Sequence, residues 1–184
     1  MKKNFSFLVI LLLGYLFFLT AAYASPVAEI ETLIVPSDTK QFQVNLNIFT
    51  DGSDISSVAF GIDFDASWTL SNVTFGSLPN YWIPTWVKGK HTFGATDFGY
   101  PATPLIDTTP FAILTFSSSA ENYFSNKSLD INFTFIEFTD SNGNIIENVT
   151  SAPGKISASV PVPASLLLFA TGLTGLFGIR RKMK

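Results

Sequence analysis

The residues of this chain whose types and spacing could support catalysis are a pair of neighbouring acidic side chains and the one histidine. Asp63 and Asp65 stand two positions apart at the end of an apolar stretch, so a strand would place both carboxylates on one face. Glycoside hydrolysis uses such a carboxylate pair. The simpler interpretation is two solvated residues at a strand end. His91 is the only histidine and no Gly-x-Ser-x-Gly elbow accompanies it, so we expect no catalytic residue and no enzyme.

A proline-rich stretch, residues 78–104, carries side chains suited to ligand contact. Tyr81, Trp82 and Trp86 lie in it, and the prolines favour an irregular loop over a core strand. Aromatic rings on rigid loops offer flat apolar faces that stack on sugar rings or anchor a protein partner. We take these three residues as candidate ligand contacts. The alternative is that the rings cap the open end of the fold.

Metal and cofactor chemistry has little support in the sequence. The segment 140–144, Asp-Ser-Asn-Gly-Asn, is rich in oxygen ligands and could hold Ca²⁺ weakly, but its glycine comes too early for an EF-hand. A hairpin turn is the simpler interpretation. The chain has no cysteine, which excludes disulfides and thiolate metal sites. We expect no cofactor and no metal site.

The elements that must position these residues are β-strands. Residues 41–49 alternate polar and apolar with period two, as do residues 58–64, and residues 109–116 and 155–160 are further strand candidates. A later strand places Ile131, Phe133, Phe135 and Phe138 inward after a register change near Glu137. Many short alternating strands separated by turns predict an all-β, antiparallel two-sheet sandwich. The predicted inward residues of the first two strands are Phe42, Val44, Leu46, Ile48, Val58, Phe60, Ile62 and Phe64.

The order of these strands resembles a cohesin domain. A strand and an Asp-Gly turn precede Val-Ala-Phe-Gly-Ile-Asp-Phe-Asp at 58–65; Phe-Ala-Ile-Leu-Thr-Phe at 111–116 and Gly-Lys-Ile at 154–156 follow. The resemblance implies a nine-stranded jelly-roll sandwich related to carbohydrate-binding modules. Cohesins bind dockerin partners through one sheet face, and no contact residue is carried over to this chain.

The N-terminus has the pattern of a secretory signal peptide. Lys2 and Lys3 precede an uncharged stretch over residues 5–19, and Ala22 and Ala24 form a small-x-small site for signal peptidase. We expect cleavage after Ala24, so that residues 1–24 are removed. An uncleaved N-terminal anchor is the alternative.

The C-terminus, residues 160–184, has the physical properties of a short membrane segment. An uncharged run over residues 164–179 makes about 24 Å of helix, nearly enough for the roughly 30 Å hydrocarbon core of a bilayer. The basic end favours the cytoplasmic side, which leaves the preceding domain outside the inner membrane. The tail's motif residues are Val160, Pro161, Val162 and Pro163 before the helix, and Arg180, Arg181 and Lys182 after it.

This succession resembles the PEP-CTERM sorting signal of Gram-negative bacteria, in a variant with Val162 in place of Glu between the prolines. The resemblance implies export, transient anchoring in the inner membrane and handling by an exosortase-type transpeptidase. It favours removal of the helix over a permanent anchor. The destination would be the cell surface or extracellular matrix of an exopolysaccharide-forming bacterium.

Between the two ends, residues 25–159 form one domain with a strongly acidic balance. All 14 acidic residues fall there, but only five lysines, which gives a formal charge of −9 and excludes nucleic acid as a partner. We expect a non-enzymatic structural or binding protein whose partner is a matrix polysaccharide or a surface protein. The alternatives are a carbohydrate-binding module built on the aromatic segment and, less favoured, a glycan-active hydrolase built on Asp63 and Asp65.

Overall fold

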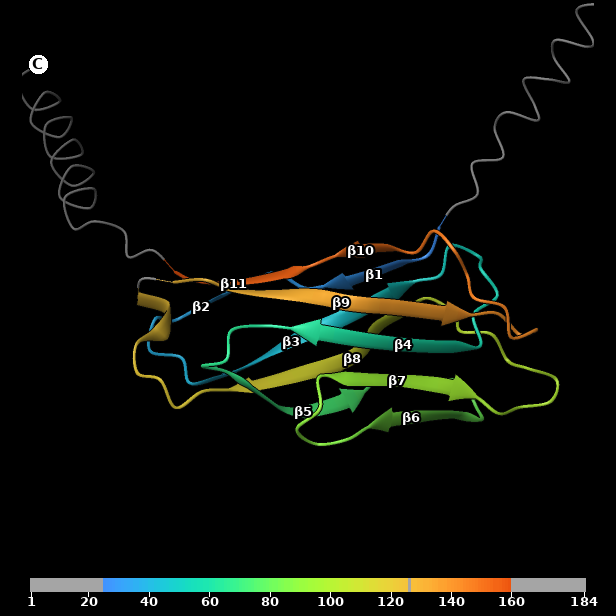
Figure 1. Ribbon diagram of the computed structural model, residues 1–184, viewed down its shortest axis with the longest axis horizontal. Helices are drawn as coiled ribbons and strands as arrows, with labels where there is room; N and C mark the ends of the chain where they lie inside the picture. The colour runs from blue at the N-terminus through green and yellow to red at the C-terminus, as the bar shows by residue number, and fades with distance from the viewer. Residues whose placement is uncertain (1–24, 126, 160–184) are drawn as a thin grey trace, which may run out of the picture.

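Two β-sheets pack face to face in this protein (Figure 1). The structure is a computed structural model and describes residues 25–125 and 127–159. Outside this range lie the predicted signal peptide with Ala22 and Ala24, the sorting motif and the predicted helix 164–179. Within it, the regular elements are strands apart from one short 3₁₀ turn, η1 (Tyr123–Ser125). The all-β two-sheet sandwich is therefore confirmed.

The five-stranded sheet has the order β10-β1-β3-β8-β5 and the six-stranded sheet the order β2-β11-β9-β4-β7-β6. Most neighbouring strands pair antiparallel; β1 with β10 and β2 with β11 pair parallel. The strands are β1 (Val27–Ile30), β2 (Leu33–Val35), β3 (Gln41–Phe49), β4 (Ser57–Asp63), β5 (Thr69–Phe75), β6 (Trp82–Trp86), β7 (Thr92–Asp97), β8 (Thr108–Ser117), β9 (Leu129–Thr139), β10 (Thr150–Ala152) and β11 (Gly154–Ala158).

The chain changes sheet twice on one side of the sandwich. β1 belongs to the five-stranded sheet and β2 to the other, and β10 and β11 make the same change across Pro153. A side chain at Gly154 would collide with Ile30, so the crossing needs a glycine. The segment 152–154 is therefore a junction between sheets, although proline followed by glycine is typical of an ordinary turn. If each interrupted pair counts as one strand, the domain has nine, as the cohesin resemblance implies.

The core follows the alternation of β3 and β4. Every predicted inward residue of these two strands is at most 9% exposed, and so is Phe64, which follows β4. Phe60 lies at the centre with no exposed surface, and the ring centroids of Phe93, Phe111, Phe133 and Phe138 lie 5.7–5.9 Å from its own. Because no disulfide supports the fold, this aromatic packing carries a large part of its stability.

Strand β9 departs from the predicted alternation. Phe135 is predicted to face the core, but its ring is 46% exposed. Gly61 of β4 lies opposite Phe135 and Ile62 lies opposite Phe133, so Thr134 has no partner. One extra residue in a strand reverses the faces of everything beyond it. The bulge at Thr134 therefore turns Phe135 outward, and the prediction for this residue is wrong.

The same bulge relocates the register change within β9. The sequence predicts it near Glu137, but Ile136 and Phe138 already face inward again, opposite Phe60 and Val58 of β4. Both placements keep Phe138 in the core, so the apolar pattern alone does not separate them. The pairing with β4 decides between them.

Residues 82–86 also differ from expectation. The prolines predict an irregular loop, but these residues form β6, the edge strand of the six-stranded sheet, paired with β7 from Trp82 opposite Asp97 to Trp86 opposite Phe93. Pro84 is tolerated because an edge strand needs only one of its sides for the ladder. The missing N–H also makes this exposed edge a poor template for another strand.

Candidate binding surface

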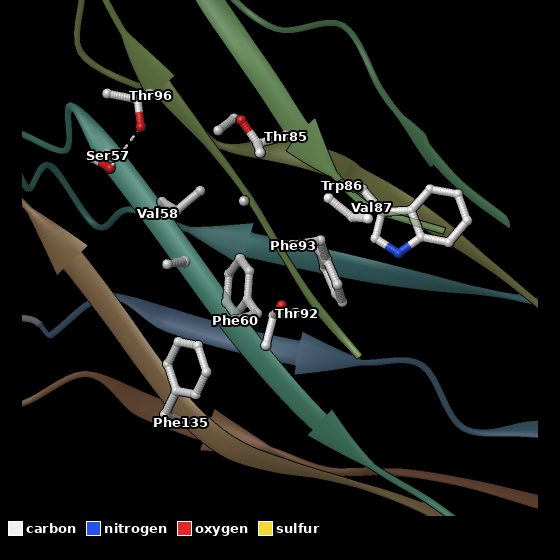
Figure 2. Close-up of a pocket in the computed structure, with 13 residues that line it drawn as sticks. Ser57, Val58, Phe60, Thr85, Trp86, Val87, Thr92, Phe93, Thr96 and Phe135 are labelled. Atoms are coloured by element: carbon white, nitrogen blue, oxygen red, sulfur yellow. Dashed lines mark hydrogen bonds between the residues drawn. The ribbon is translucent and has the colours of Figure 1, made fainter. Parts of the chain in front are cut away.

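The outer face of the six-stranded sheet carries a shallow groove of about 260 Å³ across β6, β7, β4 and β9 (Figure 2). Its inner lining includes the core residues Val58, Phe60 and Phe93. We call this hollow the threonine groove. The residues that give it its outer surface are Ser57, Ala59, Thr85, Val87, Thr92, Gly94, Thr96 and Phe135.

The groove exists because its floor has almost no side chains. Ala59 of β4 and Gly94 of β7 lie opposite each other in the ladder. A Cβ at Gly94 would collide with the backbone carbonyl oxygen of Val58, and this clash involves no movable side chain. Only glycine therefore lets β7 approach β4 as it does. The larger side chains at both edges then stand above the floor.

Phe135 forms one wall of the groove. Its ring lies against Gly61, where a Cβ would collide with both the ring and the Thr134 side chain. Glycine thus lets the outward ring lie close to the strand, although almost half of its surface stays in solvent. An aromatic ring that is fixed and half exposed is a common anchor in protein interfaces.

The groove is uncharged. Its polar groups are hydroxyls of Ser57, Thr85, Thr92 and Thr96, and the Ser57 and Thr96 hydroxyl oxygens lie 3.0 Å apart (Figure 2). None of the lining residues is ionisable. Among the described residues, no three His, Cys, Asp or Glu side chains gather as a metal site. The surface can offer apolar contact and hydroxyl hydrogen bonds, which suits binding and provides no acid or base.

The three aromatic residues predicted as ligand contacts do not share a surface. Trp82 is buried, and its indole Nε1 donates to the Thr103 carbonyl at 2.8 Å. Trp86 is half-buried beside the groove, and its Nε1 donates to the Lys90 carbonyl at 3.1 Å. Tyr81 alone is widely exposed, at 70%. Trp82 therefore serves the fold, and the expected joint site of Trp82 and Trp86 is not formed.

Of the two candidate hydrolase residues, Asp65 has a structural role in the described part of the chain. Asp65 accepts the backbone N–H of Ser67 at 2.8 Å, and this bond, followed by the Ser67 side chain, lowers the pKa of the Asp65 carboxyl. Burial, followed by its hydrogen bond to Asp65, raises the pKa of Tyr123 to about 12. A general acid needs a raised carboxyl pKa, so Asp65 is shifted the wrong way for that role. Asp63 ends β4 in solvent.

His91 is exposed, and its imidazole packs on the Phe64 ring with the centroids 4.5 Å apart. Its carbonyl accepts the N–H of Ile62 at 3.0 Å, which continues the β4–β7 ladder. The histidine thus caps the end of the core, as a structural residue would.

The oxygen-rich segment after β9 is a closed turn. Asp140 accepts the backbone N–H groups of Asn142 at 2.9 Å and Asn144 at 2.8 Å, and the Asn144 side-chain amide donates to its other oxygen at 3.0 Å. The bonds from Asn144, followed by that from Asn142, lower the pKa of the Asp140 carboxyl. Both carboxylate oxygens are therefore engaged by the turn itself, which supports the hairpin interpretation.

Comparison with known proteins supports the interpretation of the C-terminal segment. A model of the PEP-CTERM protein-sorting motif matches residues 159–182. No curated protein matches the chain. The described residues contain no helix long and apolar enough to cross a membrane. The motif match lies almost wholly outside the described residues and marks the chain as an exported protein.

Several solved cohesins are similar in structure to the domain. The third ScaB cohesin of R. flavefaciens, solved with a group 1 dockerin, has a TM-score of 0.62 at 16% identity, over 77% of this chain and 99% of that one. A non-cellulosomal cohesin from Archaeoglobus fulgidus has a TM-score of 0.57 at 16% identity, over 77% and 96%. The third cohesin ScaC with the ScaB dockerin, from Acetivibrio cellulolyticus, gives 0.58 at 19%, over 73% and 99%. The domain therefore has a cohesin-like fold.

Proposed function

We propose that this chain is an exported, non-enzymatic binding module that captures a protein partner in the threonine groove. The observation that carries the proposal is Phe135, a large apolar ring turned outward by a bulge and fixed beside a floor of Ala59 and Gly94. This face of the sheet is exposed to solvent, so a strand residue there with no binding role would be expected to be polar. Exposed apolar surface beside a hollow is typical of interaction sites.

The partner's chemistry follows from the groove. Because its lining has no charge, recognition depends on shape, on burial of the Phe135 ring and on hydroxyl hydrogen bonds. A partner that presents one or two aliphatic or small aromatic side chains fits a hollow of about 260 Å³. Charged residues around the hollow, such as Glu137 on β9 and Lys88 after β6, would influence partner choice and association rate more than affinity.

Two of the similar cohesins were solved in complex with dockerins, which are protein modules. This favours a protein partner over a small molecule, and a dockerin-type module is the first partner to test. The sequence identity of 16–19% carries no contact residue from those complexes to this chain.

The proposed site of action is the cell surface or matrix of a Gram-negative bacterium. Signal peptidase would remove residues 1–24, the domain 25–159 would fold outside the inner membrane, and an exosortase-type transpeptidase would act on the sorting segment 160–184. The match to the PEP-CTERM motif supports the last step. A binding module delivered in this way would connect its partner to an exopolysaccharide matrix.

The two other candidate functions have less support. A carbohydrate-binding module built on Tyr81, Trp82 and Trp86 loses two of its three rings to packing and internal hydrogen bonds. A glycan-active hydrolase built on Asp63 and Asp65 needs one of the two carboxyls as an acid with a raised pKa, and turn hydrogen bonds lower the pKa of Asp65. Hydrolysis assays on matrix polysaccharide with wild type and Asp65→Asn would detect such activity if it existed.

The test of the groove is partner capture by the exported protein. We would recover the protein from the surface of the expressing bacterium, immobilise it and identify proteins retained from the extracellular fraction. Retention should fall at least tenfold in Phe135→Ala and in Gly94→Leu, which fills the floor. The matched control is Ile34→Ala, because Ile34 is 68% exposed on β2, away from the groove.

Circular dichroism would check that each variant is folded. A partner that binds Phe135→Ala and wild type equally would contradict the proposal, and so would loss of the partner in Ile34→Ala alone. If Gly94→Leu unfolds, Thr85→Lys places a charge in the groove from the edge strand, where exposure makes the change compatible with the fold.

A further inference from the structure

A second surface of this domain lies at the end of the sandwich and carries exposed aromatic rings. Tyr81 precedes β6, and Phe98 and Tyr100 lie in the loop between β7 and β8; they are 70%, 69% and 103% exposed. The Phe98 N–H donates to the Tyr81 carbonyl at 3.1 Å, and the Tyr81 ring lies against Gly99. We call Tyr81, Phe98 and Tyr100 the aromatic tip.

The loop that carries the aromatic tip is held at several points. Asp97 accepts the N–H of Gly99 at 2.7 Å with one oxygen and the N–H of Thr103 with the other. The buried Trp82 indole donates to the Thr103 carbonyl, and the Leu105 N–H donates to the Ile55 carbonyl at 2.8 Å. Exposed rings on a loop that is fixed in this way lose little conformational entropy on binding.

The backbone of Tyr81 adds an independent observation. Its φ is +72°, in the left-handed region that a bulky side chain rarely adopts. Such strain persists only where the surrounding structure enforces it, and it is found disproportionately at ligand sites. The ring on this backbone is exposed, whereas the neighbouring Trp82 is buried.

The loops around the aromatic tip carry negative charge. The four loops at this end, β3–β4, β5–β6, β7–β8 and β9–β10, contain Asp51, Asp54, Asp107, Asp140 and Glu147 and no basic residue. The five lysines of the domain lie outside these loops: Lys40 precedes β3, Lys88 and Lys90 lie between β6 and β7, Lys127 precedes β9, and Lys155 lies on β11, which leads toward the sorting segment at the other end (Figure 1). This end therefore repels anionic lipid and polyanions.

We propose that the aromatic tip is a binding site for a neutral polysaccharide, distinct from the threonine groove. Sugar rings present C–H faces that stack on aromatic rings, and their hydroxyls can donate to carboxylates and carbonyls, which this end has in excess. Because the aromatic tip is at the end opposite the exit toward the sorting segment, it faces away from a membrane held at that exit. Trp82 is a positioning residue, which fixes the loop through Thr103.

The test is affinity electrophoresis of the exported protein through native gels that contain hydroxyethylcellulose, xyloglucan or galactomannan, with alginate as the polyanion. We expect retardation by at least one neutral polymer and none by alginate. Phe98→Ala/Tyr100→Ala should weaken that interaction by about tenfold or more, because two stacking contacts are lost. Tyr100→Phe retains the ring and should bind nearly as well as wild type.

Trp82→Phe tests the positioning role by a separate readout. It retains a buried ring but removes the donor to Thr103, so amide hydrogen exchange at Gly99 and Thr103 should accelerate while the core strands stay protected. Polysaccharide affinity should fall by a smaller factor than in the double variant. Unchanged exchange in this loop would show that Trp82 has no positioning role.

Phe135→Ala separates this proposal from the function of the threonine groove. It should leave retardation in the gels unchanged even if it abolishes protein capture, and the double tip variant should do the reverse. The proposal is overturned if none of the three neutral polymers retards the protein, if alginate retards it more strongly, or if the folded double variant moves like wild type. Loss of retardation in Phe135→Ala alone would assign the glycan to the groove.

Discussion

The outward orientation of Phe135 can be tested by comparing two phenylalanines that the alternating pattern treats as equal. Phe60 has no exposed surface and four aromatic neighbours, so Phe60→Ala should cost about 3–5 kcal/mol through lost burial and a residual cavity. Phe135 is 46% exposed, so only about half of its side chain is removed from water by folding. Full burial of such a side chain contributes about 1.5–3 kcal/mol, so Phe135→Ala should cost only about 1 kcal/mol.

The assay is thermal unfolding of the exported protein followed by circular dichroism. For a domain of this size, 1 kcal/mol shifts the melting temperature by about 3–5 °C. Phe60→Ala should therefore melt at least about 10 °C below wild type, and Phe135→Ala only about 3–5 °C below. The exposed Ile34→Ala is the surface control, with a shift near zero. Equal shifts for the two phenylalanines would refute the bulge at Thr134 and return Phe135 to the core.

Three further predictions concern the floor of the groove, acid stability and processing. Gly94→Ala should cost about 1–3 kcal/mol in urea unfolding, because its Cβ meets the Val58 carbonyl and no side chain can move to relieve the clash. Hydrogen bonds from the Thr50 backbone and then its side chain lower the pKa of Asp107, so this carboxylate stabilises the fold above its unfolded pKa of about 3.9. That stability is lost as pH falls through the lowered pKa, so urea titrations between pH 7 and pH 2 should show a shallower loss in Asp107→Asn than in wild type. Intact-mass measurement on surface protein from an exosortase-containing host should find residues 164–184 absent; the tail on every molecule would leave only the permanent anchor.

Local patterns predicted much of the framework. β3 matches its predicted bounds residue for residue, and the inward faces of β3 and β4 are as the alternation indicated, because a half-buried strand must place apolar groups every second residue. The sorting motif was recognisable for a similar reason: its prolines, apolar run and terminal cations are local features that need no tertiary partner. Asp140 was interpretable as a turn residue from its neighbours alone.

The candidate surfaces were less accessible to such reasoning. Trp82 and Tyr81 are adjacent, yet one is buried and the other 70% exposed, and this difference depends on the pairing of β6 with β7 and on the left-handed backbone of Tyr81. The proline at position 84 suggested a loop because proline breaks central strands, and nothing local revealed that β6 is an edge strand. Nothing in the sequence marked Phe98 as a ligand contact, because a single aromatic residue between Asp97 and Gly99 fits a core strand or a loop equally well.

The sequence by itself determined the class of the fold, the inward faces of its regular strands and the exported character of the chain, because each depends on composition or on spacing within one segment. Only the tertiary structure decided which way Phe135 faces, that the Trp82 indole holds the loop before β8, and that the loops around the aromatic tip bring together carboxylates and no basic residue. Those features depend on which residue of one strand lies opposite which residue of another. A bulge of a single residue, such as that at Thr134, reverses a face without changing the apolar pattern that sequence reasoning can see.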